Sequence, residues 1–215
     1  MIEENLDEIK HKIESSAIRS GRTLQDIMLI CVTKYSDVDQ IKTIVDLGQI
    51  NLGENRIKDA LEKVKQLKND ICWHMIGHLQ TNKAKDAVSF SEWIHSVDSV
   101  KIANAIDKEA KKIGKVQKIL IEVNVAKEAS KHGFLVDDLA RSFDEIVKLK
   151  NIEIKGFMTI APVCSPEQTR PFFKELRQLK EKFSVEHLSM GMSQDYEVAI
   201  EEGATMVRVG SAIFR

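Results

Sequence analysis

Apolar residues recur along the chain in two different periods. Near the start, Leu6, Ile9 and Ile13 follow the helical repeat and Gly21 ends it, which predicts an amphipathic helix over residues 3–20. After this helix, short apolar runs rich in β-branched residues alternate with charged segments of helical period. The chain is therefore expected to alternate between buried strands and surface helices.

Eight such apolar runs predict eight strands. They are residues 27–33, 50–53, 72–77, 93–97, 117–125, 152–158, 186–189 and 205–209. Clear helical segments between them are residues 37–47, 55–67, 99–112 and 136–149. Strands that alternate with helices form a parallel sheet buried on both faces. Because no linker rich in Pro, Gly or Ser interrupts the eight units, the sequence favours a closed (β/α)8 TIM barrel over an open, doubly wound sheet. Residues 1–215 are expected to form one domain.

Charge and composition narrow the classes of partner. The 32 Lys and Arg residues nearly balance the 33 Asp and Glu residues, so no strong net field attracts nucleic acid or an anionic membrane. A phosphate-bearing ligand must then be held by local donors. The sequence has no apolar stretch of the roughly 20 residues that span a bilayer, and its start does not resemble a signal peptide. A cytoplasmic location is therefore expected. The protein is also expected to be a monomer, since no long apolar surface stripe is left over.

The three cysteines are scattered and are not expected to form structural disulfides. Cys31 and Cys72 lie in apolar runs, which predicts small buried side chains. Cys72, His74 and His78 share strand parity and invite comparison with a zinc site. Zinc sites generally have a fourth ligand and tighter spacing, so no metal site is expected here.

Lys34 directly follows the first predicted strand. Reactive groups of such barrels lie at the carboxyl ends of the strands. Lys34 shares the parity of Met28, Ile30 and Val32, so it should point inward if those apolar side chains do. A partly desolvated lysine near other cations is a nucleophile that forms Schiff bases with carbonyl compounds. A solvated loop lysine fits the same position, so this residue alone leaves both interpretations open.

The segments after the last two strands carry features of an anion site. Ser193 precedes a helical pattern and is expected to be its N-cap, where its hydroxyl and the free amides of the first turn would hold an anion. Gly210 would let backbone amides approach a ligand closely, and Ser211 adds a hydroxyl. Many barrels bind phosphate after strands seven and eight. A plain helix cap also explains Ser193, so phosphate binding rests on the combination.

Two further polar residues lie near this expected mouth. Arg208 belongs to the last apolar strand, and a barrel-interior arginine is costly unless it is paired. Its own strand offers no acidic residue, so a ligand acceptor is its expected partner. Asn55 follows the second strand and would either cap the next helix or contact a ligand. No phosphate-binding glycine motif follows a strand, which argues against nucleotide binding by that route.

Two stretches of sequence are highly specific, Trp-His-Met-Ile-Gly-His-Leu-Gln-Thr-Asn-Lys at 73–83 and Leu-Ser-Met-Gly-Met-Ser-Gln-Asp at 188–195. Shorter motifs accompany them at 32–34, 53–56, 96–99, 124–133, 156–158 and 196–214. In this order, and over nearly the whole chain, they resemble the YggS/PROSC family of pyridoxal phosphate homeostasis proteins. The resemblance implies a barrel like the alanine racemase N-terminal domain that binds pyridoxal 5′-phosphate (PLP).

The resemblance also implies which residues bind the cofactor. They are Lys34, Asn55, Met192, Ser193, Arg208, Gly210 and Ser211. Lys34 is implied to hold PLP as a Schiff base, while Ser193, Gly210 and Ser211 hold its phosphate. Arg208 is implied to face the pyridine nitrogen. Because a guanidinium keeps its proton, it would leave that nitrogen unprotonated and the ring a weaker electron sink.

Three functions are compatible with these residues. The favoured one is a carrier and buffer that delivers PLP to apo-enzymes and has no dedicated catalytic activity. The second is a PLP-dependent amino acid racemase, but racemases of the related fold carry a second base, a tyrosine, on an additional β domain. This chain has only two tyrosines and no residues left for such a domain. The third is a barrel that binds a sugar phosphate or a protein partner and leaves Lys34 unmodified.

Overall fold

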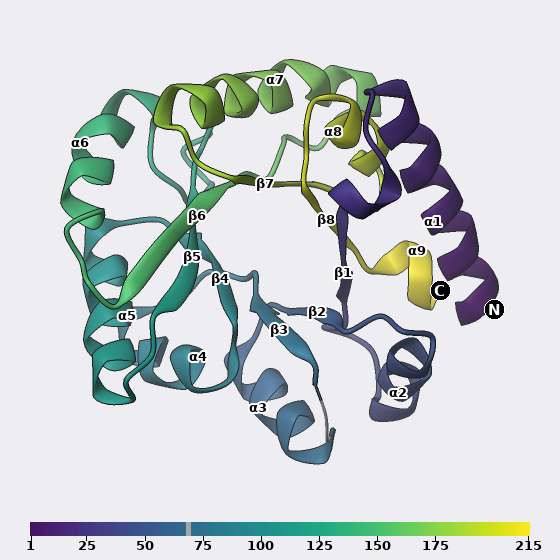
Figure 1. Cartoon of the computed structure of the whole chain (residues 1–215), viewed down its shortest axis with the longest axis horizontal. Helices are drawn as coiled ribbons and strands as arrows, with labels where there is room; N and C mark the ends of the chain where they lie inside the picture. Colours follow the sequence, from purple (N-terminus) through teal and green to yellow (C-terminus); the bar gives the residue numbers. More distant parts are fainter. Residues whose placement is uncertain (68–69) are drawn as a thin grey trace.

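Eight parallel strands close into one barrel in sequence order, from β1 to β8 (Figure 1). The computed structural model describes residues 1–67 and 70–215. The strands are β1 (Met28–Val32), β2 (Asn51–Glu54), β3 (Cys72–Met75), β4 (Trp93–Val97), β5 (Gln117–Glu122), β6 (Ile152–Met158), β7 (His187–Met192) and β8 (Met206–Val209). The predicted fold class is confirmed.

Helices surround the barrel (Figure 1). They are α1 (Ile2–Arg19), α2 (Val38–Asp46), α3 (Ile57–Gln66), α4 (Ala84–Phe90), α5 (Val100–Lys112), α6 (Val136–Ile146), α7 (Pro166–Phe183), α8 (Tyr196–Glu201) and α9 (Ser211–Phe214), with short 3-10 helices η1 (Leu24–Asp26) and η2 (Thr81–Lys83). The opening helix α1 packs against α8 and α9. None of the helices in the described ranges has the length and apolar character to cross a membrane.

The predicted strand bounds agree with the structure to within about two residues except at β5 and β7, since β5 was expected over residues 117–125 and ends at Glu122. Strands β4 and β6 have the predicted ends, whereas β7 was expected over residues 186–189 and continues to Met192. Met190 extends the buried face of the strand, and Gly191 (φ +90°) lies so close to α8 that a Cβ there would come within 2.6 Å of the Ala199 Cβ. The glycine thus lets the chain run on against α8, which begins only at Tyr196.

Side chains of the strands alternate between an outer and an inner core. Leu29 and Cys31 pack outward among the helices, while a small apolar cluster fills the inside of the barrel. This inner cluster consists of Ile30, Trp93, Leu120, Met158 and Met206, with Met28 and Cys72 packed against it. The predicted inward parity of the first strand is therefore confirmed. All three cysteines are free; Cys31 is buried as predicted, and Cys72 is half-buried.

A chain of buried polar side chains also crosses the barrel interior. Arg208 Nη1 donates to Ser189 Oγ at 2.6 Å, and this oxygen lies 2.9 Å from His95 Nδ1. His95 Nε2 lies 3.0 Å from His74 Nδ1, and His74 Nε2 lies 3.2 Å from Asn51 Oδ1. The five side chains come from β8, β7, β4, β3 and β2. We call them the interior polar chain.

The two ends of the interior polar chain fix the direction of its hydrogen bonds. Asn51 Oδ1 only accepts, so His74 Nε2 carries the proton, and His74 Nδ1 accepts from His95 Nε2. His95 Nδ1 then accepts from the hydroxyl of Ser189, whose oxygen accepts from Arg208. Both histidines are neutral in this arrangement, and each buried group has a partner, which avoids the cost of unpaired polar atoms.

Burial keeps the two histidines neutral over a wide pH range. It lowers the pKa of His74 to about 3, and the charge of Lys118 acts in the same direction. Burial also holds the pKa of His95 well below its usual range, with His74 and Arg208 adding to the effect. The folded barrel therefore resists protonation at positions where the unfolded chain takes up protons readily.

We expect acid to destabilise the fold through this histidine pair. An unfolded histidine takes up its proton near pH 6.5, whereas the folded pKa of His74 is about 3. The stabilisation of the fold by neutral His74 is complete above the pKa of the unfolded histidine. It is lost as the pH falls toward the pKa of His74 in the folded protein. At pH 5 one such histidine should cost about 2 kcal/mol of unfolding free energy. Denaturant unfolding at pH 7.5 and pH 5 measures the difference.

The variant His74→Gln should lose less unfolding free energy between these two pH values than the parent. Its control is His11→Gln on the exposed face of α1, which should keep the parent's pH dependence. Equal losses in His74→Gln and the parent would show that the buried pair does not cause the acid sensitivity.

Candidate functional site

A cavity of about 440 Å³ opens at the carboxyl ends of the strands, beside β1, β2, β6, β7 and β8. Its lining includes all seven residues that the sequence motifs implied. They are Lys34, Asn55, Met192, Ser193, Arg208, Gly210 and Ser211. The structure thus brings together residues from both ends of the chain at one mouth of the barrel.

Buried ionic contacts fix the backbone just before Lys34. The hydroxyl of Thr33 donates to Glu54 Oε1 at 2.6 Å. Lys63 Nζ, from α3, donates to the same carboxylate oxygen and to the Thr33 carbonyl, both at 2.6 Å. Glu54 is fully buried, so breaking the pair would leave an uncompensated charge in the core. The end of β1 is therefore tied firmly to β2 and α3.

Lys34 itself lies in the turn above β1 and is exposed, whereas the sequence analysis considered a partly desolvated lysine. The reason is that β1 ends at Val32 and a turn follows, in which the Ser36 amide donates to the Thr33 carbonyl at 2.9 Å. Lys34 Nζ lies 5.0 Å from the centroid of the Tyr35 ring, which lines the same cavity. The amine is accessible on a fixed backbone.

Ser193 is not the N-cap that the sequence predicted, and that prediction is wrong. Helix α8 begins at Tyr196 with Asp195 as its N-cap, because β7 continues to Met192. The Ser193 hydroxyl instead accepts from the Gly210 amide at 3.3 Å. Asp195 Oδ1 accepts from the Met192 amide at 2.6 Å, which shapes the turn between strand and helix. Ser193 therefore joins the segments after β7 and β8.

Gly210 and Ser211 form the start of α9, a helix that the sequence analysis did not predict. A Cβ at Gly210 would lie 3.0 Å from the Val32 carbonyl oxygen and 3.1 Å from the Val32 Cβ. Glycine is thus needed for the close approach of this segment to β1. The Ser211 hydroxyl group belongs to an exposed residue at the cavity edge.

Arg208 is buried at the bottom of the cavity and has protein partners. Its guanidinium donates to Ser189 Oγ at 2.6 Å and to the Thr159 carbonyl at 2.8 Å. The expectation that a ligand must supply the acceptor was wrong, because acceptors on β7 and just after β6 already do so. Burial lowers the pKa of Arg208 to about 10, against the opposing charges of Asp195 and Glu122. The side chain remains a cation at neutral pH.

Asn55 lines the cavity but does not cap α3, whose N-cap is Arg56. Close packing holds its backbone in place. A Cβ at Gly77 would lie 2.2 Å from the Asn55 carbonyl oxygen, so Gly77 lets the segment after β3 lie directly against Asn55. Of the two roles considered for Asn55, helix capping is excluded by the structure.

One side of the cavity was not predicted from the sequence. Residues 160–164, after β6, line it, and Val163 is 99% exposed. Asp195 also lines it and is buried, which raises the pKa of its carboxyl group. The rule that reactive loops follow strands would have found residues 160–164, since the predicted sixth strand ends at Met158.

Of the two histidines compared with a zinc site, His74 lies beside Cys72, with its Nε2 3.5 Å from the Cys72 Sγ, whereas His78 does not join them. Strand β3 ends at Met75, so the alternation that placed Cys72, His74 and His78 on one face stops before His78. His74 is engaged in the interior polar chain. His78 lies instead beside Asp98, with its Nδ1 2.9 Å from Oδ2.

Comparison with known proteins agrees with this geometry. Residues 5–215 match the alanine racemase N-terminal domain family. The chain is 40% identical over 219 residues to the pyridoxal phosphate homeostasis protein of Aquifex aeolicus, covering 98% of this chain and 96% of that protein. It is 32% identical to the Escherichia coli protein of the same name, covering 99% and 95%.

Solved structures give the same result. PipY of Synechococcus elongatus with PLP bound has a TM-score of 0.87 and 32% identity to this chain, with 100% of both chains covered. An alanine racemase from Clostridium difficile has a TM-score of 0.73 at 18% identity, covering 99% of this chain and 56% of that one, which shows a shared barrel. By its sequence and by its barrel, this chain belongs to the pyridoxal phosphate homeostasis protein family.

Proposed function

We propose that this protein holds PLP covalently through Lys34 and delivers it to apo-enzymes, without a dedicated catalytic activity. One observation carries the proposal: an accessible lysine amine and a buried arginine line the same cavity. The bound PLP of PipY, at 32% identity over the full chain, supports the identity of the ligand. The relatives' shared name supports the role in PLP homeostasis.

The donors of the cavity suit the chemistry of PLP. Its lining combines an amine, a guanidinium, two hydroxyls and an amide, from Lys34, Arg208, Ser193, Ser211 and Asn55. An aldehyde needs the amine, and a phosphate dianion needs hydroxyl and backbone N–H donors close to positive charge. Gly210 also lines the cavity, where its missing Cβ lets its backbone lie close against β1. When bound, PLP supplies an electron-withdrawing ring next to the reactive carbon.

Each side chain then has a separate task. Lys34 attacks the aldehyde carbon, and the bond forms with loss of water, so it can be reversed by water or by another amine. Ser193, Gly210 and Ser211 bind the phosphate, with Met192 beside them and Asn55 near the ring. Arg208 faces the ring nitrogen and keeps its own proton there.

The arginine argues for storage rather than catalysis. A guanidinium donates to the ring nitrogen without protonating it, which leaves the ring a poor acceptor of electrons. Lys34 is exposed, so water and amines can reach the bond that must be broken for release. Racemisation is the second candidate, supported by the barrel shared with alanine racemase; this chain, however, matches homeostasis proteins over 95–96% of their length and that racemase over 56%.

We expect borohydride reduction to fix PLP on Lys34. Peptide mapping by mass spectrometry should find the reduced adduct there, and the purified protein should be yellow. Lys34→Ala should lose the adduct completely while keeping weaker binding through the phosphate contacts. Lys111→Ala, on the exposed face of α5, should behave like the parent. An adduct found mainly on Lys83 or Lys131, or a colourless parent protein, would contradict the assignment.

Arg208→Ala should still form the covalent bond but bind PLP about 10- to 100-fold more weakly, since a hydrogen bond to a charged group contributes about 1.5–3 kcal/mol. Its absorbance spectrum should also shift, because the ring nitrogen loses its partner. Arg208→Lys keeps a cation and should lie between the two. Arg22→Ala, a half-buried arginine outside the cavity, controls for general destabilisation. A spectrum and affinity equal to the parent's would exclude Arg208 as the ring's partner.

The carrier function is tested by transfer. Holo-protein mixed with an apo-enzyme that requires PLP should restore its activity even when a scavenger of free aldehyde is present. Free PLP at the same concentration is the control and should be removed by the scavenger. Racemisation of common amino acids is assayed in parallel. Turnover on the order of 1–10³ per second, typical of dedicated enzymes, would favour the racemase instead.

A further inference from the structure

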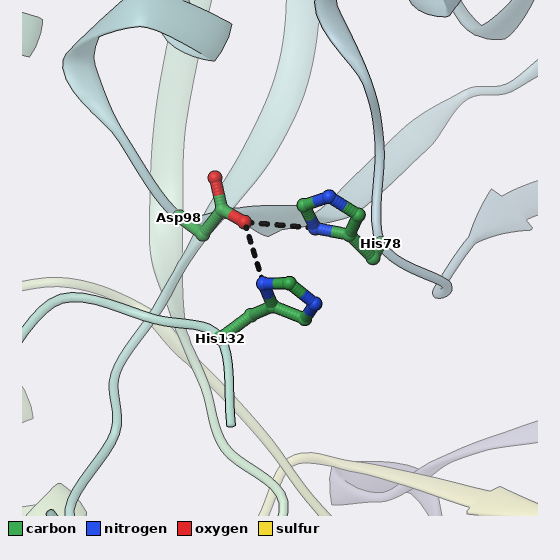
Figure 2. A group of neighbouring side chains, drawn as sticks. All are labelled: His78, Asp98 and His132. Atoms are coloured by element: carbon green, nitrogen blue, oxygen red, sulfur yellow. Dashed lines mark ion pairs between the residues drawn. The ribbon is translucent and has the colours of Figure 1, made fainter. Parts of the chain in front are cut away.

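Three metal-ligating side chains gather at the barrel mouth outside the cavity (Figure 2). His78 follows β3, Asp98 follows β4, and His132 comes from the segment between β5 and α6. In Figure 2 both imidazole rings turn a nitrogen toward the same carboxylate oxygen. The cluster therefore joins three neighbouring loops on the β3–β5 side of the mouth.

The distances within this cluster fit a metal ion. Asp98 Oδ2 lies 2.9 Å from His78 Nδ1 and 3.7 Å from His132 Nδ1. In a tetrahedral zinc site with bonds of about 2.0–2.1 Å, ligand atoms lie ~3.4 Å apart. The two measured distances bracket this value, and all three ligand atoms lie within 4.8 Å of one another.

The position of His132 is not explained by hydrogen bonding alone. Within the described part of the chain its ring makes no hydrogen bond, and 3.7 Å to Asp98 is too long for one. It nevertheless stacks on His78, with ring centroids 3.7 Å apart and planes 11° from parallel. A bound metal ion would replace this weak stacking contact with two coordination bonds, one to each ring.

The segment that carries His132 is well supported by backbone contacts. The Phe134 amide donates to the Glu122 carbonyl at 2.8 Å, and the Asn124 amide donates to the Phe134 carbonyl at 2.9 Å. Gly133 adopts φ +110°, where a Cβ would meet the Asn124 nitrogen at 2.8 Å. The chain around Phe134 thus folds back against the end of β5, and this places His132 at the barrel mouth.

An ion can reach the site from solvent, and Asp98 is its least exposed ligand. His78 is 41% exposed and His132 56%, while Asp98 is 11% exposed. Two imidazoles and one carboxylate form the donor set of several zinc sites that keep a fourth position open. Imidazole suits zinc and related transition metals, whereas magnesium and calcium prefer oxygen ligands.

We infer that His78, Asp98 and His132 bind one divalent transition-metal ion of the zinc class. The fourth position stays open to water or to an anionic ligand. The site links the loops after β3, β4 and β5 and is separate from the PLP cavity.

Zinc binding to the untagged, cofactor-free full chain tests this inference. Competition with a chromogenic chelator should show one tight equivalent of Zn²⁺. Single variants His78→Ala and His132→Ala should bind at least about 10-fold more weakly, and the double variant should lose the tight equivalent. Co²⁺ loading should give a visible absorption band in the parent that the double variant lacks.

The control is His11→Ala, another exposed histidine, on α1, which should bind zinc like the parent. Thermal unfolding in the presence of a chelator checks that every variant is folded. No saturable binding by the parent, or tight binding that persists in the double variant, would overturn the site.

Discussion

Closure of the barrel by pairing of β1 with β8 is the constraint on which the rest of the structure depends. Met28 pairs with Met206 and Ile30 with Arg208 in parallel register. This register sets the inward face of β1 beside that of β8, so the segments that follow them meet at the same mouth. Lys34 and Gly210, far apart in sequence, become walls of one cavity. An open sheet would leave them on opposite edges.

The backbone just before the exposed Lys34 is held in place by buried contacts. The Glu54 carboxylate accepts from both Thr33 and Lys63, and Glu54 has no exposed surface. A buried ion pair of this kind adds little net stability against an apolar alternative. It does fix the strand end from which Lys34 projects.

The sequence predicted the elements better than the details at their ends. Alternation of apolar runs identified eight strands, because buried parallel strands have few polar residues. It failed where a glycine changes the geometry: Gly191 extends β7, so Ser193 could not cap α8. The partners of Arg208 could not be predicted either, since Ser189 belongs to β7 and Thr159 follows β6. All seven residues implied by motif resemblance line the cavity, but residues 160–164 and Asp195 line it too and were not among them. Strand parity alone had reached only some of the seven.

The interior polar chain connects the two ends of the barrel, which have different roles. In barrels of this kind, the carboxyl-end face is associated with activity and the opposite face with stability. Here Asn51 lies at the amino end of β2 and accepts a hydrogen bond from His74. This fixes the direction of the hydrogen bonds that continue through His95 and Ser189 to Arg208. The interior polar chain therefore connects the two ends of the barrel through its interior. Asn51, on the supporting face of this barrel, thus takes part in orienting the Arg208 guanidinium that lines the cavity.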